Sequence, residues 1–298
     1  MKRAADIRIG ISGWRYKGWR GTFYPEKLPQ RSELEFAARH FNSIELNGSF
    51  YSLQKPQHFH SWYNATPPGF VFAVKGSKYV THMLRLLRIE TPLANFFAQG
   101  LLRLKEKLGP ILWQFPPQVK FDSERFDAFF SLLPRSQKEA ADLGSLHDHR
   151  LDGRNWLAVE RDYPIRHAVE IRHESFACDE FICLLRKHKV GLVVADTVEW
   201  PLLMDVTADF VYCRMHGSEQ LYASGYEADA IRVWADRVTT WAGGGEVSDG
   251  RKACGKDATC RKSRDVYVYF DNDAKVRAPY DAMSLRNELG VMATRRAA

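Results

Sequence analysis

Ionisable side chains recur at or directly after short apolar segments of this sequence. They include acids, one lysine and one arginine that we take as candidate catalytic groups: Glu45, Lys75, Glu170, Arg172, Asp196 and Asp271. A charged group beside apolar residues is costly to bury unless it finds a partner. Carboxylates that neighbouring cations hold at different pKa values can divide the work of a general acid and a general base. The pattern predicts acid/base chemistry, and an ion-pair network without chemistry is the structural alternative.

A second set of residues at the same places is suited to contact a substrate. It comprises Trp14, Asn47, Tyr51, Gln114, His173, Arg214, His216, Gly217 and Asn272. Arginine can grip a phosphate group as a fork, and glycine lets the backbone approach a ligand closely. Arg214-x-His216-Gly217 therefore predicts a phosphate or sulfate site shared with Asn272. A glycine that only turns the chain is the alternative.

Carboxylates and histidines from several segments would also suit metal-assisted hydrolysis. Acids and bases are nearly balanced among the candidates, whereas a metal site needs surplus negative charge. A divalent metal ion is therefore the less favoured interpretation, and no cofactor is indicated. Five cysteines without a C-x-x-C pair, and no export signal, predict free thiols in the cytoplasm.

Eight short segments rich in β-branched and aromatic residues must position these side chains. They are Ile7–Ile11, Ser43–Leu46, Phe70–Val74, Ile111–Phe115, Ala168–Ile171, Gly191–Ala195, Phe210–Met215 and Val266–Phe270. Most are almost continuously apolar, as parallel strands covered on both faces are. Because helical patterns separate most of them, the sequence predicts an α/β fold of the (β/α)8 TIM-barrel type. The sixth and seventh segments are about 14 residues apart, so we expect one short or irregular connection.

The helical patterns carry their own start and stop signals. Ser32-x-x-Glu35 predicts a capping box, and Thr91-Pro92 predicts a helix that runs to Gly109-Pro110. Aromatic residues at helical spacing predict further helices near 126–133 and 231–241. We expect one barrel domain over residues 1–298 with long loops at about 134–167 and 242–265. The second loop is polar, basic and rich in glycine, which predicts an exposed excursion.

In such a barrel the carboxyl ends of all strands meet on one ring, so residues far apart in sequence can converge there. We expect Glu170 to form a functional pair with Glu45 or Asp196. Because side chains alternate along a strand, Glu170 and Arg172 should share the inward face.

Seven segments in chain order carry a resemblance to a known family. They are GISGWRYKGWRGTFYP, FNSIELNGSFY, FVFAVKGSKYVTH, GPILWQFPP, AVEIRHESF, VYCRMHG and VYVYFDND. With them the chain, from about Ile7 to Leu289, resembles the YecE-like family, domain of unknown function 72. The resemblance implies a TIM barrel and brings no established reaction.

Composition and charge restrict the classes of function that this protein can have. The 298 residues have a formal net charge of +7 and are 45% hydrophobic, and no apolar run of about 18 residues predicts a membrane span. We favour an enzyme that acts on a small anionic or phosphorylated substrate. One alternative is a protein that binds nucleic acid, or processes it with a metal ion, and this would need a basic stripe across the barrel mouth. The other is a barrel that binds a ligand without catalysis. The sequence does not indicate an oligomeric state.

Overall fold

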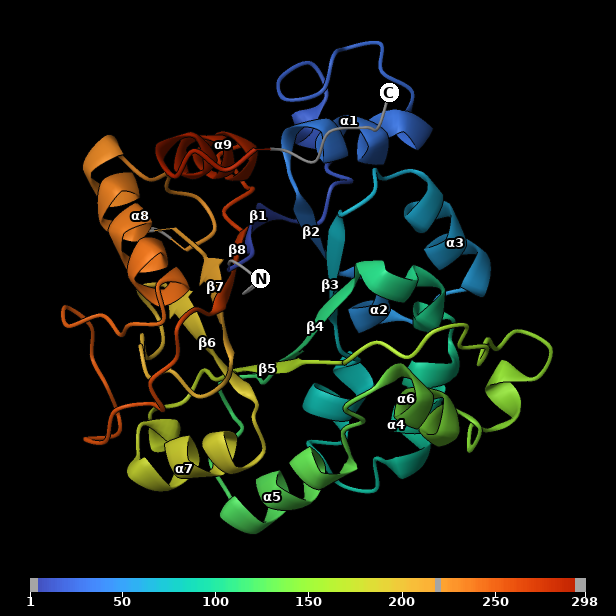
Figure 1. Ribbon diagram of the computed structural model, residues 1–298. Coiled ribbons are helices and arrows are strands. Elements are labelled where there is room, and N and C mark those ends of the chain that lie inside the picture. Colours follow the sequence, from blue (N-terminus) through green and yellow to red (C-terminus); the bar gives the residue numbers. More distant parts are fainter. Residues whose placement is uncertain (1–4, 218–220, 293–298) are drawn as a thin grey trace.

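The computed structural model describes residues 5–217 and 221–292, and within them eight parallel strands close into a barrel (Figure 1). Each strand pairs with its neighbours in sequence, and the last pairs with the first. The predicted (β/α)8 TIM barrel is confirmed, and each predicted segment overlaps a strand. The strands are β1 (Ile7–Ser12), β2 (Ser43–Leu46), β3 (Val71–Lys75), β4 (Leu108–Gln114), β5 (His167–Glu170), β6 (Gly191–Asp196), β7 (Phe210–Met215) and β8 (Asp265–Phe270).

Helices surround the strands (Figure 1). In the described residues the α-helices are α1 (Glu33–His40), α2 (Gly48–Tyr51), α3 (Pro56–Asn64), α4 (Glu90–Ala98), α5 (Ser123–Leu132), α6 (Gln137–Gly144), α7 (Asp179–Lys187), α8 (Ala228–Ala242) and α9 (Ala278–Glu288). Short turns of 3-10 helix lie at Lys17–Trp19, Gln30–Ser32, Leu101–Lys107, His149–Leu151 and Glu174–Phe176, and a π-helical turn lies at Tyr79–Met83. No helix in the described ranges is long and apolar enough to cross a membrane.

The long helix predicted after Thr91-Pro92 is wrong in its second half. Helix α4 ends at Ala98, and Gly100 has a φ of +111°, which breaks the helical path. A Cβ atom at Gly100 would lie 2.6 Å from the Cα of Pro56, so only glycine allows α3 to pack this closely. The chain continues as 3-10 turns and enters β4, where Gly109 and Pro110 are strand residues.

The start of α1 is at the predicted place but lacks the predicted capping box. Ser32 precedes the helix, yet its side chain makes no capping hydrogen bond. Its backbone is already helical because the turn Gln30–Ser32 runs directly into the helix. The first helical residue, Glu33, is instead buried and accepts a hydrogen bond from Arg20 Nε at 2.9 Å.

The connections differ in how much regular structure they contain. Residues 197–209, between β6 and β7, contain no helix, which is the irregular connection predicted there. Residues 134–167 include α6, and residues 243–264 contain neither helix nor strand. This last segment is not exposed along its whole length, because Cys254 and Arg264 are buried. The Asp205 carboxylate accepts hydrogen bonds from the backbone N–H groups of Ala253 and Cys254, at 2.8 and 3.0 Å.

Two layers of packing follow from the alternation of side chains along each strand. One set of residues fills the barrel interior: Ala73, Leu112, Ala168, Val193, Ala195, Phe210, Tyr212, Tyr267 and Tyr269. The larger cluster lies between the barrel and the helices. On β3, β5 and β7 the inward positions continue to Lys75, Glu170 and Arg214, so the apolar interior ends in a charged layer at the carboxyl ends of the strands.

Candidate active site at the carboxyl ends of the strands

Arg214 lies at the centre of the charged layer and is fully buried. Its Nη2 atom is 2.9 Å from Glu45 Oε1 and 2.7 Å from Asp271 Oδ2, and its Nη1 atom is 2.6 Å from Glu170 Oε2. Carboxylates from β2, β5 and the residue after β8 therefore share one guanidinium. The structure brings together these three of the predicted acids, and it joins Glu170 to Glu45 through Arg214.

The cations decide the ionisation of these acids. Burial by itself would raise the pKa of Glu170, but Arg214 and Arg172 hold that pKa well below its usual range. Burial acts in the same direction on Asp271, and Arg214 and His216 outweigh it and lower the pKa. Both groups are therefore carboxylates near neutral pH, which makes them acceptors of hydrogen bonds rather than acids.

Further hydrogen bonds fix the orientation of the cluster. Tyr212 donates its hydroxyl to Glu45 Oε2 at 2.6 Å, and Ser12 Oγ donates to Glu45 Oε1 at 2.5 Å. Arg172 Nε donates to Glu170 Oε1 at 2.8 Å, so Glu170 and Arg172 share the inward face as predicted. Tyr212 and Ser12 were not among the predicted catalytic or binding residues. Their inward register with Arg214 and Glu45 is the signal that could have identified them.

The predicted phosphate site around Arg214 is wrong. Its guanidinium is saturated by carboxylates and is 0% exposed, which leaves no face for an anion. Asn272 points away from the mouth, where its Nδ2 atom donates to Ser224 O and to Asp281 Oδ2 at 2.9 and 2.7 Å. Gly217 has a φ of +108°, and its N–H donates to the Tyr226 hydroxyl at 3.1 Å. This glycine turns the chain.

The assignment of Asp196 to the catalytic group is also wrong. Val193 and Ala195 of β6 point into the barrel, so Asp196 points outward. There it interacts with Tyr226 and with Trp234 of α8, and burial raises its pKa. The expected partner of Glu170 is therefore Glu45 and not Asp196.

Lys75, the last residue of β3, differs from the other cations of the site. It is 8% exposed, and within the described part of the chain its ammonium group has no hydrogen bond and no ion pair; it lies 4.4 Å from the centre of the Phe50 ring. Burial, and next the charge of Arg214, lower the pKa of Lys75 from 10.5 to about 8. A substantial fraction of this amine is neutral at mildly alkaline pH, so it can accept a proton or act as a nucleophile.

Asp273 provides a group of the opposite kind at the same end of the barrel. Burial and the neighbouring Asp271 raise its pKa from 3.8 to about 6. With a pKa of about 6, Asp273 is mostly ionised at neutral pH and adds negative charge to this end of the barrel. Asp273 was not among the predicted catalytic residues, although it stands two positions after Asp271.

Gln114 and Asn47, two of the predicted binding residues, each contact another polar side chain of the site. Gln114 Nε2 is 3.5 Å from His82 Nε2, and burial, followed by the charge of Lys75, lowers the pKa of His82 to about 4. Asn47 Nδ2 donates to Ser12 Oγ at 3.0 Å, while its Oδ1 is buried without a partner among the described residues. The structure therefore places Gln114 and Asn47 beside the charged layer.

A small pocket of about 350 Å³ opens next to this layer. Its lining includes three of the predicted binding residues: Trp14, Asn47 and Tyr51. Trp14 is almost buried and packs edge-on against Trp62, with ring centres 5.6 Å apart, whereas Tyr51 is 74% exposed.

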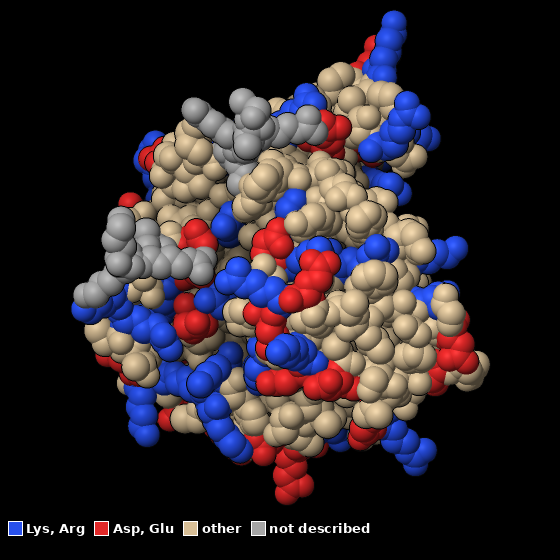
Figure 2. Space-filling view, turned by 45° about the vertical axis from the view of Figure 1, so that its right-hand side comes forward, with Lys and Arg blue, Asp and Glu red and all other residues tan. Residues whose placement is uncertain are grey.

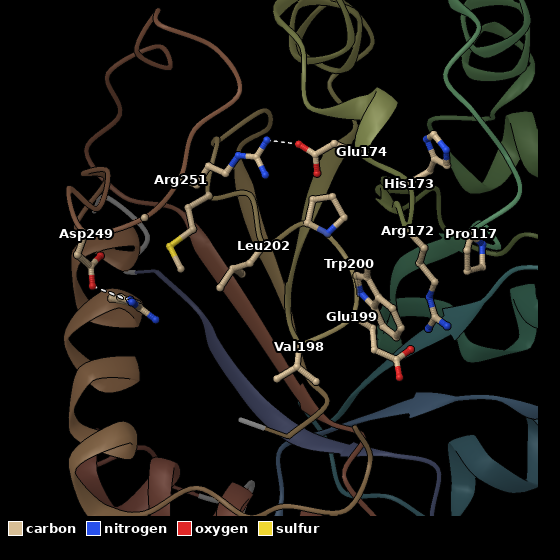
Figure 3. A pocket seen from close by; sticks show the side chains of 14 residues that line it. Pro117, Arg172, His173, Glu174, Val198, Glu199, Trp200, Leu202, Asp249 and Arg251 are labelled. Atoms are coloured by element: carbon tan, nitrogen blue, oxygen red, sulfur yellow. Dashed lines mark hydrogen bonds and ion pairs between the residues drawn. The ribbon is translucent and has the colours of Figure 1, made fainter. Parts of the chain in front are cut away.

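A larger pocket of about 770 Å³ lies beyond the carboxyl ends of β5 and β6 (Figure 3). Arg172 and His173 line it together with Trp200, and the Arg172 guanidinium stands 3.9 Å from the centre of the Trp200 ring. Arg172 therefore connects the buried carboxylates with an open pocket. Trp200 belongs to the irregular connection after β6, where no periodic pattern marks it, so sequence reasoning did not find it.

Two ion pairs lie between residues that line this pocket. Arg251 pairs with Glu174, and Arg237 Nη2 pairs with Asp249 Oδ2 at 2.8 Å (Figure 3). Because Asp249 and Arg251 belong to segment 243–264, that segment forms one wall of the pocket.

The carboxylates of the charged layer surround the Arg214 guanidinium, which occupies the position that a metal ion would need. Within the described ranges, no group of three or more His, Cys, Asp or Glu side chains is arranged to hold a metal ion. His216 belongs to the same cluster, since its Nδ1 atom is 3.2 Å from Asp271 Oδ2.

Comparison with known proteins places this architecture among uncharacterised families. The sequence family described as "Protein of unknown function DUF72" matches residues 8–297. The UPF0759 protein YecE of Escherichia coli (strain K12) is 31% identical over 254 residues, which are 79% of this chain and 82% of that protein. The UPF0759 protein YunF of Bacillus subtilis is 32% identical over 116 residues, which are 37% of this chain and only 40% of that protein.

Solved structures agree with the fold. A DUF72 family protein of Thermotoga maritima has a TM-score of 0.71 at 24% identity, and the match covers 96% of this chain and 99% of that chain. A DUF72 family protein of Enterococcus faecalis has a TM-score of 0.68 at 16% identity and covers 98% and 99% of the two chains. At sequence identities of 24% and 16%, these structural matches show that this chain shares the fold of the two proteins.

Proposed function

This chain belongs to the family described as protein of unknown function DUF72, and from that premise we propose that its barrel mouth is the active site of an enzyme for a small anionic substrate. The proposed reaction begins with proton abstraction by the neutral amine of Lys75. The observation that carries the proposal is the burial of this lysine without a hydrogen bond or ion pair in the described structure. Because this amine is largely removed from water and has no partner in the described structure, it is available to exchange a proton with a bound substrate.

The charge balance in the mouth depends on the protonation state of Lys75. With Lys75 protonated, three cations face three carboxylates: Lys75, Arg172 and Arg214 against Glu45, Glu170 and Asp271. When Lys75 loses its proton, the layer has one excess negative charge. An anion bound beside Lys75 favours the charged form of the amine and so raises its pKa. A bound anion therefore makes the neutral amine a stronger base and stabilises the ammonium that forms when it takes a proton.

Arg172 is the residue best placed to hold the anionic group of the substrate. Its Nε and Nη2 atoms contact Glu170, and Nη2 also donates to the Tyr222 hydroxyl at 3.2 Å. Its Nη1 atom makes no hydrogen bond within the described ranges, and the side chain lines the pocket of Figure 3. Glu170 holds the Arg172 guanidinium in place, and Glu170 is itself held by Arg214. The protonated Lys75 that results from the abstraction can return the proton to the product.

Solvent deuterium exchange tests this function without knowledge of the full reaction. Small phosphorylated and carboxylated hydroxy and keto acids are incubated with the protein in D2O, and proton NMR follows the loss of the proton on the carbon α to the carbonyl or carboxyl group. We expect exchange with at least one compound, and we expect Lys75→Met to abolish it while binding of that compound persists. Lys78→Met, at an exposed lysine three residues further on, is the matched control. Exchange that survives in Lys75→Met would contradict the assigned role.

The two alternative functions find less support in the geometry. A metal-dependent nuclease needs a set of metal ligands, whereas Arg214 occupies the centre of these carboxylates. A nucleic-acid groove at the mouth needs surplus positive charge, whereas the charges there are balanced. A non-catalytic ligand site would leave the lowered pKa of Lys75 without a role.

A further inference from the structure

A third pocket, of about 730 Å³, lies at the opposite end of the barrel from the mouth. The loops that lead into the amino ends of β5, β6, β7 and β8 contribute to it. Its lining contains a high density of basic side chains: Arg135, Arg166, Arg186, Lys187, His188, Lys189 and Arg261. Among the described residues that line it, Asp209 is the one acid. The pocket shares no lining residue with the site at the mouth.

Part of this positive charge is compensated by neighbouring acids. Arg166 pairs with Asp209 at 3.2 Å and with Asp265 at 2.7 Å. Lys187 and His188 both contact Asp127, at 2.7 and 2.5 Å. These pairs account for three of the basic side chains.

The other four cations have no ion pair in the part of the chain that the structure describes. Arg186 donates from Nη1 to Lys256 O at 2.9 Å and from Nε to Val206 O at 3.3 Å. Arg135 donates from Nη2 to Phe130 O at 3.3 Å. Backbone carbonyls thus fix both guanidinium groups in position without neutralising them. Lys189 and Arg261 add two exposed charges at the rim.

We propose that this basic pocket binds a small polyanion that carries two or more linked phosphate groups. Its volume is that of a small-molecule site, and guanidinium groups match phosphate oxygens in geometry and charge. The unpaired cations come from separate loops, so a chain of phosphates can reach more of them than a single phosphate can. Within the described lining there is no Phe, Tyr or Trp on which bases could stack, unlike in single-strand nucleic-acid sites. The pocket therefore recognises the phosphates themselves.

Figure 2 shows how charge is distributed over one face of the molecule. Lys and Arg side chains gather toward the lower left of this face, whereas neutral side chains cover much of its right-hand part. On this face the positive charge is therefore not spread evenly, and a concentrated positive area attracts polyanions.

Calorimetric titration with inorganic tripolyphosphate and with orthophosphate tests the proposal. Tripolyphosphate should bind at least about tenfold more tightly than orthophosphate, because it engages more cations. The double variant Lys189→Glu with Arg261→Glu should lose about tenfold or more in affinity for tripolyphosphate. The neutral version, Lys189→Gln with Arg261→Gln, should lose less. Both positions are exposed, so these variants should fold.

A matched control separates the pocket from the overall charge. Lys27 and Arg31 are exposed residues on another part of the chain, between β1 and α1. Lys27→Glu with Arg31→Glu changes the net charge by the same amount and should leave tripolyphosphate affinity within about twofold of the wild type. An equal loss in this control would overturn the proposal, because the charge of the whole protein would then explain the binding.

Two further results would also overturn it. Lys75→Met should leave tripolyphosphate binding unchanged, and a loss there would place the ligand at the mouth. Equal affinities for orthophosphate and tripolyphosphate would remove the argument for linked phosphates. A single-stranded oligonucleotide that binds in the pocket while tripolyphosphate does not would assign the pocket to nucleic acid instead.

Discussion

Arg214 of β7 and Glu45 of β2 are 169 residues apart in sequence, and their side chains meet in the barrel interior with Nη2 2.9 Å from Oε1. Both residues are fully buried. The closed barrel makes this contact possible, because it brings the carboxyl ends of distant strands onto one ring. Glu170, Asp271, Tyr212 and Ser12 make their contacts to one or both members of this ion pair.

Removal of the central cation should destabilise the protein strongly. Arg214→Met leaves the buried carboxylates of Glu45 and Glu170 without their main partner, and breaking a buried ion pair in this way costs about 3–5 kcal/mol. Urea denaturation measures the loss in free energy of unfolding. Arg39→Ala, which breaks the exposed pair with Glu35 in α1, should cost only about 0.3–0.5 kcal/mol. Similar losses in the two variants would show that the cluster contributes no more than a surface pair.

Lys75 should give the protein a distinctive alkaline stability profile. The pKa of this lysine is lowered from 10.5 to about 8, so between these values the unfolded chain binds more protons than the folded one. Stability from this group therefore rises with pH from about 8 to about 10.5. At about 1.4 kcal/mol per unit, the rise is on the order of 3 kcal/mol.

Comparison of variants isolates that effect from other titrations. Unfolding free energies are measured by urea denaturation from pH 7 to 10.5 for the wild type, Lys75→Met and Lys78→Met. The difference between the wild type and Lys75→Met should change in favour of the wild type as the pH rises. The Lys78→Met profile should follow that of the wild type. Parallel curves for the wild type and Lys75→Met would contradict the burial of a charged amine at neutral pH.

The backbone after Lys75 has no room for a side chain at Gly76. A Cβ atom there would lie 2.3 Å from the Trp113 ring. Gly76→Ala should therefore displace Trp113 and cost about 1–3 kcal/mol of stability. Gly18→Ala, where a Cβ atom would meet nothing within 4 Å, is the matched control and should be close to neutral. Thermal unfolding measures both, and a neutral Gly76→Ala would contradict the close contact.

Segment 243–264 should become more accessible to proteases when its anchor is removed. Asp205→Ala deprives the backbone N–H groups of half-buried Ala253 and buried Cys254 of their acceptor, and a buried donor left unsatisfied costs about 1–3 kcal/mol. We expect limited proteolysis to cut the segment several times faster in this variant, with the barrel still folded by circular dichroism. Asp249→Ala removes a surface ion pair of the same segment and should change the cutting rate little. Equal rates in Asp205→Ala and the wild type would show that the anchor does not hold the segment.

The strands were predictable because their apolar runs are short and separated by helical patterns, as buried parallel strands require. The break in the helix near Gly100 was not. Residues 91–108 keep a helical spacing of apolar side chains, and the break follows from close packing of Gly100 against Pro56, which no local pattern records.

The candidate site was predictable in part for a similar reason. Position at a strand end identified Glu45, Glu170, Arg214 and Asp271, but it did not distinguish inward from outward side chains. Alternation does make that distinction: Ala195 points inward, so Asp196 points outward. The saturation of Arg214 by carboxylates depends on which strands face each other across the barrel. That relationship exists only in three dimensions, so the predicted anion site failed there.

The titration of Lys75 tests the central claim most directly. Reductive methylation with 13C-labelled formaldehyde marks the lysine amines, and Lys75→Met identifies the Lys75 signal among the NMR resonances followed from pH 6 to 12. The buried and unpaired position of this residue predicts a midpoint near pH 8, in line with its pKa of about 8. A midpoint above about 10, the range of ordinary lysines, would mean that the amine is solvated or paired and would contradict its role as the base of the site.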